Sequence, residues 1–369
     1  MMYPILAAES VFDGIKQFIN AICQPHWFLI LSVLALGVFL VGYRSLTKPA
    51  VAIPIAAFLS LAFLASCFDA NFLEIVRKAD NVPIVIMMVT VGYFLWLAFR
   101  QAAINDENIE QGKPLIEAGS DDKVLVWPDL VYIEFICLIL CTAFLTVWAI
   151  ILRAPLEQPA DPNVAPNPAK APWYFLGLQE MLVYFDPWLA GVVLPGLIIV
   201  GLMAIPYMDK NPRGNGYYTF KERKFAITTF LVGFVILWVV LIIFGTFLRG
   251  PNWNFFGPFE FWDPHRPAAL LNVEFHDLIW IGLMGRALPE HYLMRELPGI
   301  LLLGAYFVAG PLLLKVFFFN KIYRQIGFIR FSVMAMLILV MGLMPIKMVL
   351  RWTLNLHYIV GITEWFLNV

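Results

Sequence analysis

Eight apolar runs, each long enough to cross a lipid bilayer, constrain this chain more than any other feature. A helix needs about 20 predominantly apolar residues to span the hydrocarbon core. Lipid offers no partners to backbone N–H and C=O groups, so uninterrupted runs of this length must form helices. We therefore predict an all-α integral membrane protein with about eight transmembrane helices, near residues 27–43, 51–68, 82–99, 129–152, 187–208, 225–248, 298–319 and 331–350.

Composition narrows the class of function further. The chain is 61% hydrophobic and 14% charged, and its formal net charge of −1 gives no reason to expect nucleic-acid binding. Cys137 and Cys141 lie four residues apart in one apolar run, where cysteines commonly serve as small packing residues. The sequence contains no CxxCH or CxxC pattern. We therefore expect neither attached c-type haem nor a metal site.

The distribution of lysine and arginine predicts the orientation, because these residues concentrate in connections on the inner side of a membrane. Three connections between spans are basic: the one after the first span, with Arg44 and Lys48, the one at 207–224 and the one after the seventh span. These three connections all lie on the inner side if the N-terminus lies on the outer side, which is the electrically positive side of the membrane. The loop at 153–172 and the stretch at 249–298 then face outward.

The longest polar segments suggest a division into four parts. Residues 1–101 would hold an interfacial helix and three spans, and residues 102–126 would form a polar linker. Residues 127–250 would form a three-helix unit with a long loop. Residues 251–369 would hold an outer interfacial segment and the last two spans.

The loop between the fourth and fifth spans is rich in proline, at positions 155, 159, 162, 166, 168 and 172. Proline interrupts helices and favours an extended, stiff path. That path would deliver Pro172, Trp173 and Tyr174, followed by a short helix carrying Glu180, to the membrane boundary. A rigid aromatic segment at this depth suits the wall of a pocket for an amphiphilic molecule that arrives from the lipid.

The motifs around this loop resemble a known family. Three motifs follow one another in a fixed order with the spans: Trp127-Pro128-Asp129 precedes a span, and Pro159-Ala160-Asp161-Pro162 and Trp173-Tyr174-Phe175 lie between that span and the next. This pattern resembles subunit IV of cytochrome b6f complexes and the C-terminal half of cytochrome b in bc1-type complexes, over residues 127–250. In that family the loop ends in a Pro-Glu-Trp-Tyr motif that lines the quinol-oxidation pocket. The resemblance thus implies quinol contacts from Pro172, Trp173, Tyr174, Phe175 and Leu178.

The chain departs from the motif at one position. Pro172 stands where the family has the glutamate that accepts a proton during quinol oxidation. Glu180 is the nearest candidate replacement, because desolvation beside Leu178 would make its carboxylate a stronger base; the alternative is an interfacial residue facing the headgroups. Tyr174 could bond a quinone oxygen or serve as a membrane-belt tyrosine. Asp186 is expected to cap the fifth span, and Lys347 to extend to the outer interface.

The histidines bear on cofactors. Cytochromes b of this kind hold two haems between paired histidines on facing helices, whereas all five histidines here lie outside the spans or at their edges: His26, His265, His276, His291 and His357. We therefore expect no haem ligated by this chain alone. The resemblance implies b haems on a cytochrome b6-like partner subunit, a Rieske iron–sulfur protein and a cytochrome c-type subunit.

The resemblance also implies an assembly and a membrane. The chain would be a subunit of a bc-type quinol:cytochrome c (or similar acceptor) oxidoreductase, dimeric by resemblance, in a bacterial inner or other energy-transducing membrane, with lipid around its outer spans. Two further functions stay open. One is a structural subunit of a respiratory complex with a degenerate quinol site, which the missing glutamate favours. The other is a secondary transporter, against which stand the lack of repeats and of charges at mid-membrane.

Overall fold

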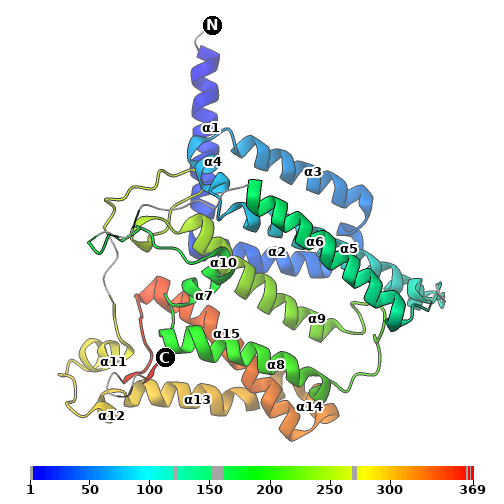
Figure 1. Ribbon diagram of the computed structural model, residues 1–369. Coiled ribbons are helices and arrows are strands. Elements are labelled where there is room, and N and C mark those ends of the chain that lie inside the picture. The colour runs from blue at the N-terminus through cyan, green and yellow to red at the C-terminus, as the bar shows by residue number, and fades with distance from the viewer. Residues whose placement is uncertain are drawn as a thin grey trace.

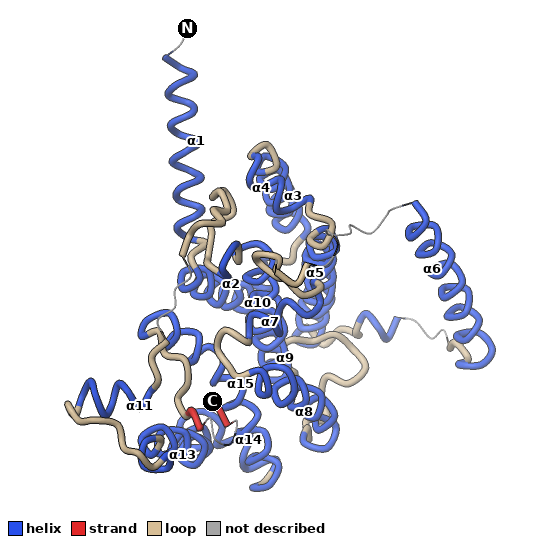
Figure 2. The backbone as a smooth tube through the Cα atoms, turned by 60° about the vertical axis from the view of Figure 1, so that its left-hand side comes forward, coloured by secondary structure: helices blue, strands red, loops and turns tan. Residues whose placement is uncertain are grey.

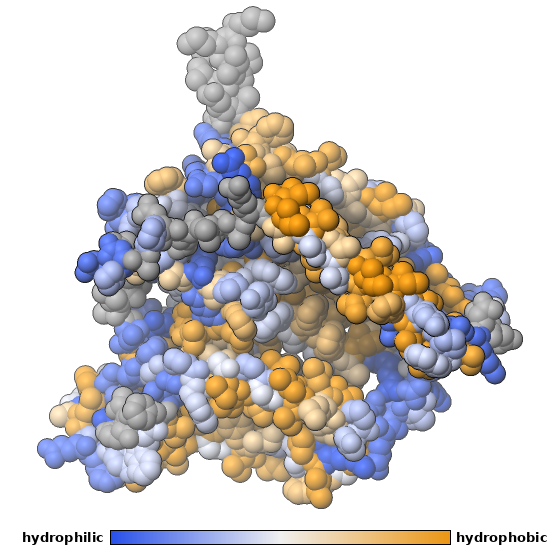
Figure 3. All heavy atoms as spheres, in the orientation of Figure 1, coloured by the Kyte–Doolittle hydropathy of each residue, from blue (hydrophilic) through white to orange (hydrophobic). Residues whose placement is uncertain are grey.

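The computed structural model describes residues 3–119, 123–151, 159, 161–163, 165–267, 272–362, 365 and 367–369, and the side chains of these from residue 12 onward. Within these ranges, eight helices are long and apolar enough to cross a membrane. Hydrophobic side chains cover the long helices, and hydrophilic ones gather toward two ends of the molecule (Figure 3). The chain is therefore an all-α integral membrane protein, as the apolar runs predict.

The eight spans agree in order and position with the predicted runs. They are α2 (Pro25–Leu46), α3 (Pro49–Ser66), α5 (Val82–Glu110), η2 with α6 (Val126–Leu130, Val131–Ile151), η4 with α8 (Leu189–Val193, Leu194–Met208), α9 to η6 (α9 Lys224–Leu231, η5 Val232–Val239, α10 Val240–Ile243, η6 Phe244–Leu248), α13 to α14 (α13 Leu297–Leu313, η9 Leu314–Phe319, α14 Asn320–Ile326) and α15 (Phe328–Leu354).

Short elements connect these spans. They are α1 (Tyr3–Ile22), α4 (Ala70–Arg77), η1 (Ile116–Gly119), η3 (Trp173–Phe175), α7 (Leu176–Met181), η7 (Pro251–Trp253), α11 (Phe275–Asp277), η8 (Leu278–Leu283), α12 (Tyr292–Arg295), and the antiparallel pair of strands β1 (Gly361–Ile362) and β2 (Leu367–Asn368). Helix α1 runs across the direction of α3 and projects from the body (Figure 1), which is the geometry of the expected interfacial helix.

The connections between spans sort to two ends of the molecule (Figure 1). At one end, which we term the basic end, Lys221 pairs with Glu110, and Phe225 packs against Phe319 before α14. At the other, the loop end, Asn167 of the proline-rich loop bonds to Asn252. The basic connections therefore lie together and opposite the proline-rich loop, as the lysine and arginine bias predicts. Which end faces outward stays a prediction.

The largest buried cluster surrounds the sixth span. Phe244, Val240 and Ile236 pack there against Met344 and Met348 of α15. Helix α13 approaches the chain beyond α15 closely, because a Cβ placed on Gly299 would lie 2.0 Å from the carbonyl oxygen of Ile359. Small residues permit such close approach where lipid supplies no hydrophobic drive between helices.

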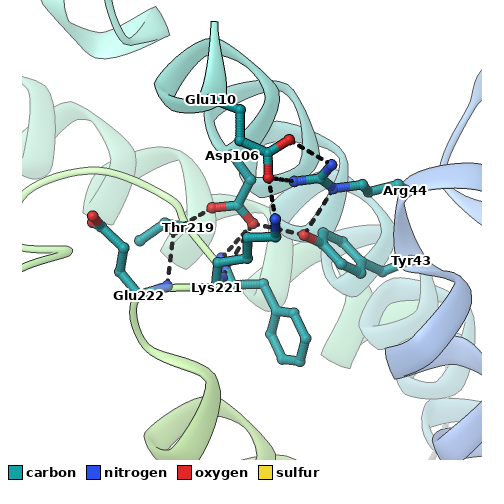
Figure 4. A network of polar contacts seen from close by, with 8 residues as sticks. Tyr43, Arg44, Asp106, Glu110, Thr219, Lys221 and Glu222 are labelled. Carbon is teal, nitrogen blue, oxygen red and sulfur yellow. Dashed lines mark hydrogen bonds and ion pairs between the residues drawn. The ribbon is translucent and has the colours of Figure 1, made fainter. Parts of the chain in front are cut away.

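A buried carboxylate joins the first three spans to the middle of the chain (Figure 4). Asp106, near the end of α5, accepts hydrogen bonds from the hydroxyl of Tyr43 at 2.8 Å and from the hydroxyl of Thr219. It also accepts the backbone N–H groups of Phe220 and Lys221, each at 3.1 Å. Four donors satisfy a carboxylate well enough to offset its burial.

Charged side chains surround that carboxylate at the basic end. Glu110 accepts both guanidinium nitrogens of Arg44, at 2.8 and 2.9 Å, and pairs with Lys221. The polar segment that begins at residue 102 is thus helical as far as Glu110, where α5 ends. Its first part holds the N-terminal spans against the connection at 209–223, and the domain boundary within it stays a prediction.

Helix α6 stands apart from the rest of the molecule (Figure 2). None of its residues is buried, Glu134 included. Residues 120–122 before it and residues 152–158 after it lie outside the described part of the chain. The apolar surface of this span is therefore open to lipid or to a neighbouring subunit.

The chain after α15 bears on two predictions, the interfacial position of Lys347 and the capping role of Asp186. Lys347 does not extend to the interface: it is buried and donates to the carbonyl oxygen of His357 at 2.6 Å, because the chain after α15 folds back over the end of that helix. Asp186 accepts the N–H of Trp188 at 3.0 Å, so the predicted cap of the fifth span is confirmed. Its second oxygen accepts the side-chain amide of Asn368.

Candidate functional site

The proline-rich loop has an extended backbone at Pro172, as its sequence predicts, whereas residues 162–163 form a turn and residues 167–168 a bend. Pro172 has φ −51° and ψ 148°, which is the polyproline region. The chain then turns through η3 (Trp173–Phe175) into the short helix α7. Residues 152–158, 160 and 164, which include Pro155, lie outside the described residues.

Side-chain hydrogen bonds fix the loop to the helices below it. The side-chain oxygen Oε1 of Gln179 accepts a hydrogen bond from the backbone N–H of Ala171 at 2.7 Å. Its side-chain nitrogen Nε2 donates to the backbone carbonyl oxygen of Ala169 at 2.8 Å. Further back, the side-chain oxygen of Asn167 accepts the N–H of Asn252 at 2.6 Å. Anchors on both sides hold the segment that leads to Trp173 in one course.

The fixed loop presents three consecutive aromatic rings. The ring centres of Trp173 and Tyr174 lie 5.6 Å apart, and those of Tyr174 and Phe175 lie 4.8 Å apart. Tyr174 and Phe175 are each about half exposed, at 50% and 51%. Pro172 is exposed, whereas Leu178 packs partly against the main core. The predicted quinol-contacting residues thus form an open aromatic surface rather than a closed pocket.

Glu180 faces away from this surface and is fully buried. Arg249 donates to both of its oxygens, from Nη2 to Oε1 at 2.8 Å and from Nε to Oε2 at 3.0 Å. The Tyr184 hydroxyl also donates to Oε1, at 2.9 Å. Burial raises the pKa of Tyr184 well above its usual value, so the hydroxyl keeps this proton.

This geometry corrects the sequence argument on Glu180. The expected burial is found, and the alternative of a carboxylate facing the headgroups is wrong. The argument considered only neighbours in the sequence, whereas Arg249 lies 69 residues further along the chain. A carboxylate held by two guanidinium bonds and a phenol is committed as an acceptor and is not a free base.

Arg249 is a residue of the candidate site that was not identified from the sequence. It directly follows η6, where the sixth span ends, and its guanidinium lies 3.7 Å from the ring centre of Phe255. Nη1 donates to the carbonyl oxygen of Trp253 at 2.6 Å. The available signal was an arginine directly after an apolar run, in a connection expected to face outward, where basic residues are few.

A comparison with known families bears on this arrangement. Residues 159–257 match the family model described as cytochrome b(C-terminal)/b6/petD. This segment is therefore similar to a cytochrome b C-terminal domain. The match includes the aromatic surface, Glu180 and Arg249, and it supports the assignment of the chain as a membrane subunit of a bc-type complex. It begins later than the resemblance at 127–250 and covers about a quarter of the chain. No solved structure matches the chain.

Lys170 is a second basic residue of the cytochrome b C-terminal domain that lies close to the loop anchors. Its ammonium donates to the carbonyl oxygen of Thr246 at 2.9 Å and lies 4.7 Å from the ring centre of Trp262. Burial lowers its pKa to about 7; the positive charges of Lys78 and Arg249 act in the same direction, and the negative charge of Glu180 opposes them.

The basic end holds a cavity of about 540 Å³, far from the aromatic surface. The connection at 214–219 lines one side, and α9 residues such as Ile227 and Phe230 line the other. Arg223 at its edge is already bonded to Asp209 and Asn215. Within the described part of the chain, no cluster of His, Cys, Asp and Glu could hold a metal ion.

Proposed function

We propose that the chain is a membrane subunit of a bc-type quinol:cytochrome c (or similar acceptor) oxidoreductase and supplies one wall of its outer quinol-oxidation pocket. The observation that carries the proposal is the anchored aromatic surface of Trp173, Tyr174 and Phe175 inside a cytochrome b C-terminal domain. A planar quinol ring stacks well on such rings. The headgroup would also contact Pro172 and Leu178.

Tyr174 is the residue that would orient the quinol. Its hydroxyl forms no hydrogen bond within the described residues, and the side chain is half exposed. A phenol hydroxyl in this position can donate to a quinone oxygen or accept from a quinol hydroxyl. Ligand sites use a few polar groups of this kind to set orientation within an apolar wall.

Partner subunits would complete the pocket, because the aromatic surface is open on its outer side. A cytochrome b6-like subunit would carry the b haems and pack along α6, which has no buried residue of its own. A Rieske iron–sulfur protein would take the first electron, and a cytochrome c-type subunit would pass it on. The complex would be dimeric, surrounded by lipid, in a bacterial inner or other energy-transducing membrane.

We assign Glu180 a positioning role within this site. Its ion pair with Arg249 joins α7, which carries the aromatic surface, to the end of the sixth span. Service as proton acceptor would require the pair to open, and breaking a buried pair costs about 3–5 kcal/mol. The proposal therefore leaves the aromatic surface as the binding element and Glu180 as its support.

Steady-state quinol oxidation by the assembled complex tests the proposal. Tyr174→Phe should lower kcat/KM by about threefold to tenfold, the equivalent of one hydrogen bond of about 0.5–1.5 kcal/mol. Tyr207→Phe is the matched control, since Tyr207 is 78% exposed at the other end of α8. Wild-type kinetics in Tyr174→Phe and in Trp173→Leu would instead favour the structural subunit with a degenerate site.

A further inference from the structure

A quinol-oxidation site needs a proton acceptor, and the two carboxylates that follow the aromatic surface are engaged elsewhere. Oxidation makes quinol hydroxyls strongly acidic, so a nearby base must take the proton. Glu180 is held by Arg249. Asp186 accepts hydrogen bonds from the backbone N–H of Trp188 and from the side-chain amide of Asn368. Since proline occupies position 172, the proton acceptor must be a group other than these carboxylates.

We propose that Lys170 is the proton-accepting group of the outer quinol site, in its neutral amine form. The inference rests on the proposed function and deepens it. It follows from the position of the side chain, from the charges that face it and from the unpaired polar atoms around it.

The Lys170 amine bonds the end of the sixth span, and the helix that follows the aromatic surface packs against that end. The amine bonds the carbonyl oxygen of Thr246, and the neighbouring Gly245 packs against Leu176: a Cβ on that glycine would lie 3.1 Å from the Leu176 carbonyl oxygen. Leu176 is the first residue of α7, directly after Phe175. The Gln179 side chain bonds the backbone on both sides of Lys170, so the amine is held in place.

The charges around Lys170 favour its neutral form. Within the described part of the chain, it forms no ion pair with a carboxylate. Lys78 beyond α4 and Arg249 beyond the sixth span are both positive, and Glu180 of α7 is already compensated by Arg249. Burial is the largest cause of the low pKa, and Lys78 and Arg249 add to it against the opposing charge of Glu180; the resulting pKa of about 7 makes the amine an effective base at neutral pH.

Three buried polar atoms of the loop end, two of them on the residues that Lys170 contacts, lack hydrogen-bond partners among the described residues. They are the hydroxyl oxygen of Thr246 and the indole nitrogens of Trp253 and Trp262. Buried polar atoms are normally paired with protein or with ordered water. Water bonded to these atoms would connect the Lys170 amine to the outer solvent and give the proton a way out.

The proton balance of the step is simple. The Lys170 nitrogen takes the proton of a quinol hydroxyl, so an O–H bond breaks, an N–H bond forms and the electron pair stays on the quinol oxygen. The quinolate is then oxidised by the one-electron acceptors of the partner subunits, an iron–sulfur cluster and a haem. The ammonium returns its proton to the outer water before it accepts the second one.

The pH dependence of quinol oxidation by the assembled complex tests this role. In the wild type, kcat should rise with pH through about 7, as the amine loses its proton. Lys170→Arg keeps a donor for the Thr246 carbonyl but cannot deprotonate. It should lower kcat about 100-fold at pH 7.5, abolish the rise near pH 7 and leave KM unchanged. Lys210→Arg, at an exposed residue of the basic end, is the matched control.

A second measurement does not depend on turnover or on the variant's folding. An amine-reactive reagent applied to the wild-type complex over a pH series should modify Lys170 half-maximally near pH 7 and Lys210 only above pH 9. The inference would be overturned if Lys170 were labelled over the same pH range as Lys210. It would also be overturned if the Lys170→Arg complex kept the wild-type pH profile. If Tyr174→Phe and Trp173→Leu are both wild type, the proposed function itself fails instead.

Discussion

Arg249 and Glu180 form a buried, two-bond ion pair that joins the end of the sixth span to the helix below the aromatic surface. The pair lies entirely within the cytochrome b C-terminal domain. The carboxylate here supports the site from below, and the aromatic rings face outward.

The ion pair should be strongly coupled in mutational tests. Arg249→Met leaves the Glu180 carboxylate buried without its partner and should destabilise the protein by about 3–5 kcal/mol. The double variant Glu180→Met with Arg249→Met removes both charges and should recover most of that loss. Thermal unfolding of the purified complex in detergent measures both effects. Strictly additive losses would show that the two residues act independently.

The Gln179 bonds should control the course of the loop. Gln179→Leu removes both backbone contacts at Ala169 and Ala171 while keeping a similar volume. We expect faster amide exchange of residues 169–175 and a quinol KM raised by up to about 30-fold, since two hydrogen bonds of about 1 kcal/mol each are lost. Gln111→Leu at the end of α5, in the exposed polar segment, is the control. Unchanged exchange would show that the prolines alone hold the loop.

The Asp106 network should fix the connection at 209–223 to the first three spans. Asp106→Ala leaves Thr219, Tyr43 and two backbone N–H groups without their acceptor. We expect faster protease cleavage and amide exchange in residues 209–223, with a loss of stability of about 3 kcal/mol or more. Glu110→Ala removes exposed contacts only and should have little effect. Equal effects of the two variants would contradict the role of the buried carboxylate.

The contact of α13 with the C-terminal segment should depend on Gly299. Gly299→Ala would place a Cβ 2.0 Å from the Ile359 carbonyl oxygen, so the backbone must move. We expect a lower melting temperature and weaker assembly. Gly304→Ala, on the same helix with no atom within 4 Å of the new Cβ, should be neutral or slightly stabilising. An unchanged melting temperature in Gly299→Ala would show that the C-terminal segment does not pack against α13 at this position.

The sequence was sufficient for the features that local physics determines. The eight spans follow from the length of the apolar runs, and the common end of the basic connections follows from where Arg44, Lys221 and Arg223 fall along the chain. The cap at Asp186 and the extended course at Pro172 are also local properties. The family resemblance rested on residue order and was found again at 159–257.

The remaining features depend on contacts between distant residues. Glu180 meets Arg249 across 69 residues, Lys170 meets Thr246 across 76, and Asp106 meets Thr219 across 113. Neighbours in the sequence suggested a base at Glu180 and an interfacial lysine at Lys347. The fold instead buries Glu180 with a guanidinium and covers Lys347 with the chain around His357.

Photolabelling of the assembled complex tests the central claim most directly. A quinone analogue carrying a photoreactive group on its ring, irradiated in the membrane, should form adducts within residues 172–178 of this chain. Excess quinol should prevent the labelling. Adducts found only on other subunits, or at the cavity of the basic end around Tyr217, would contradict the assignment of the aromatic surface as a wall of the quinol pocket.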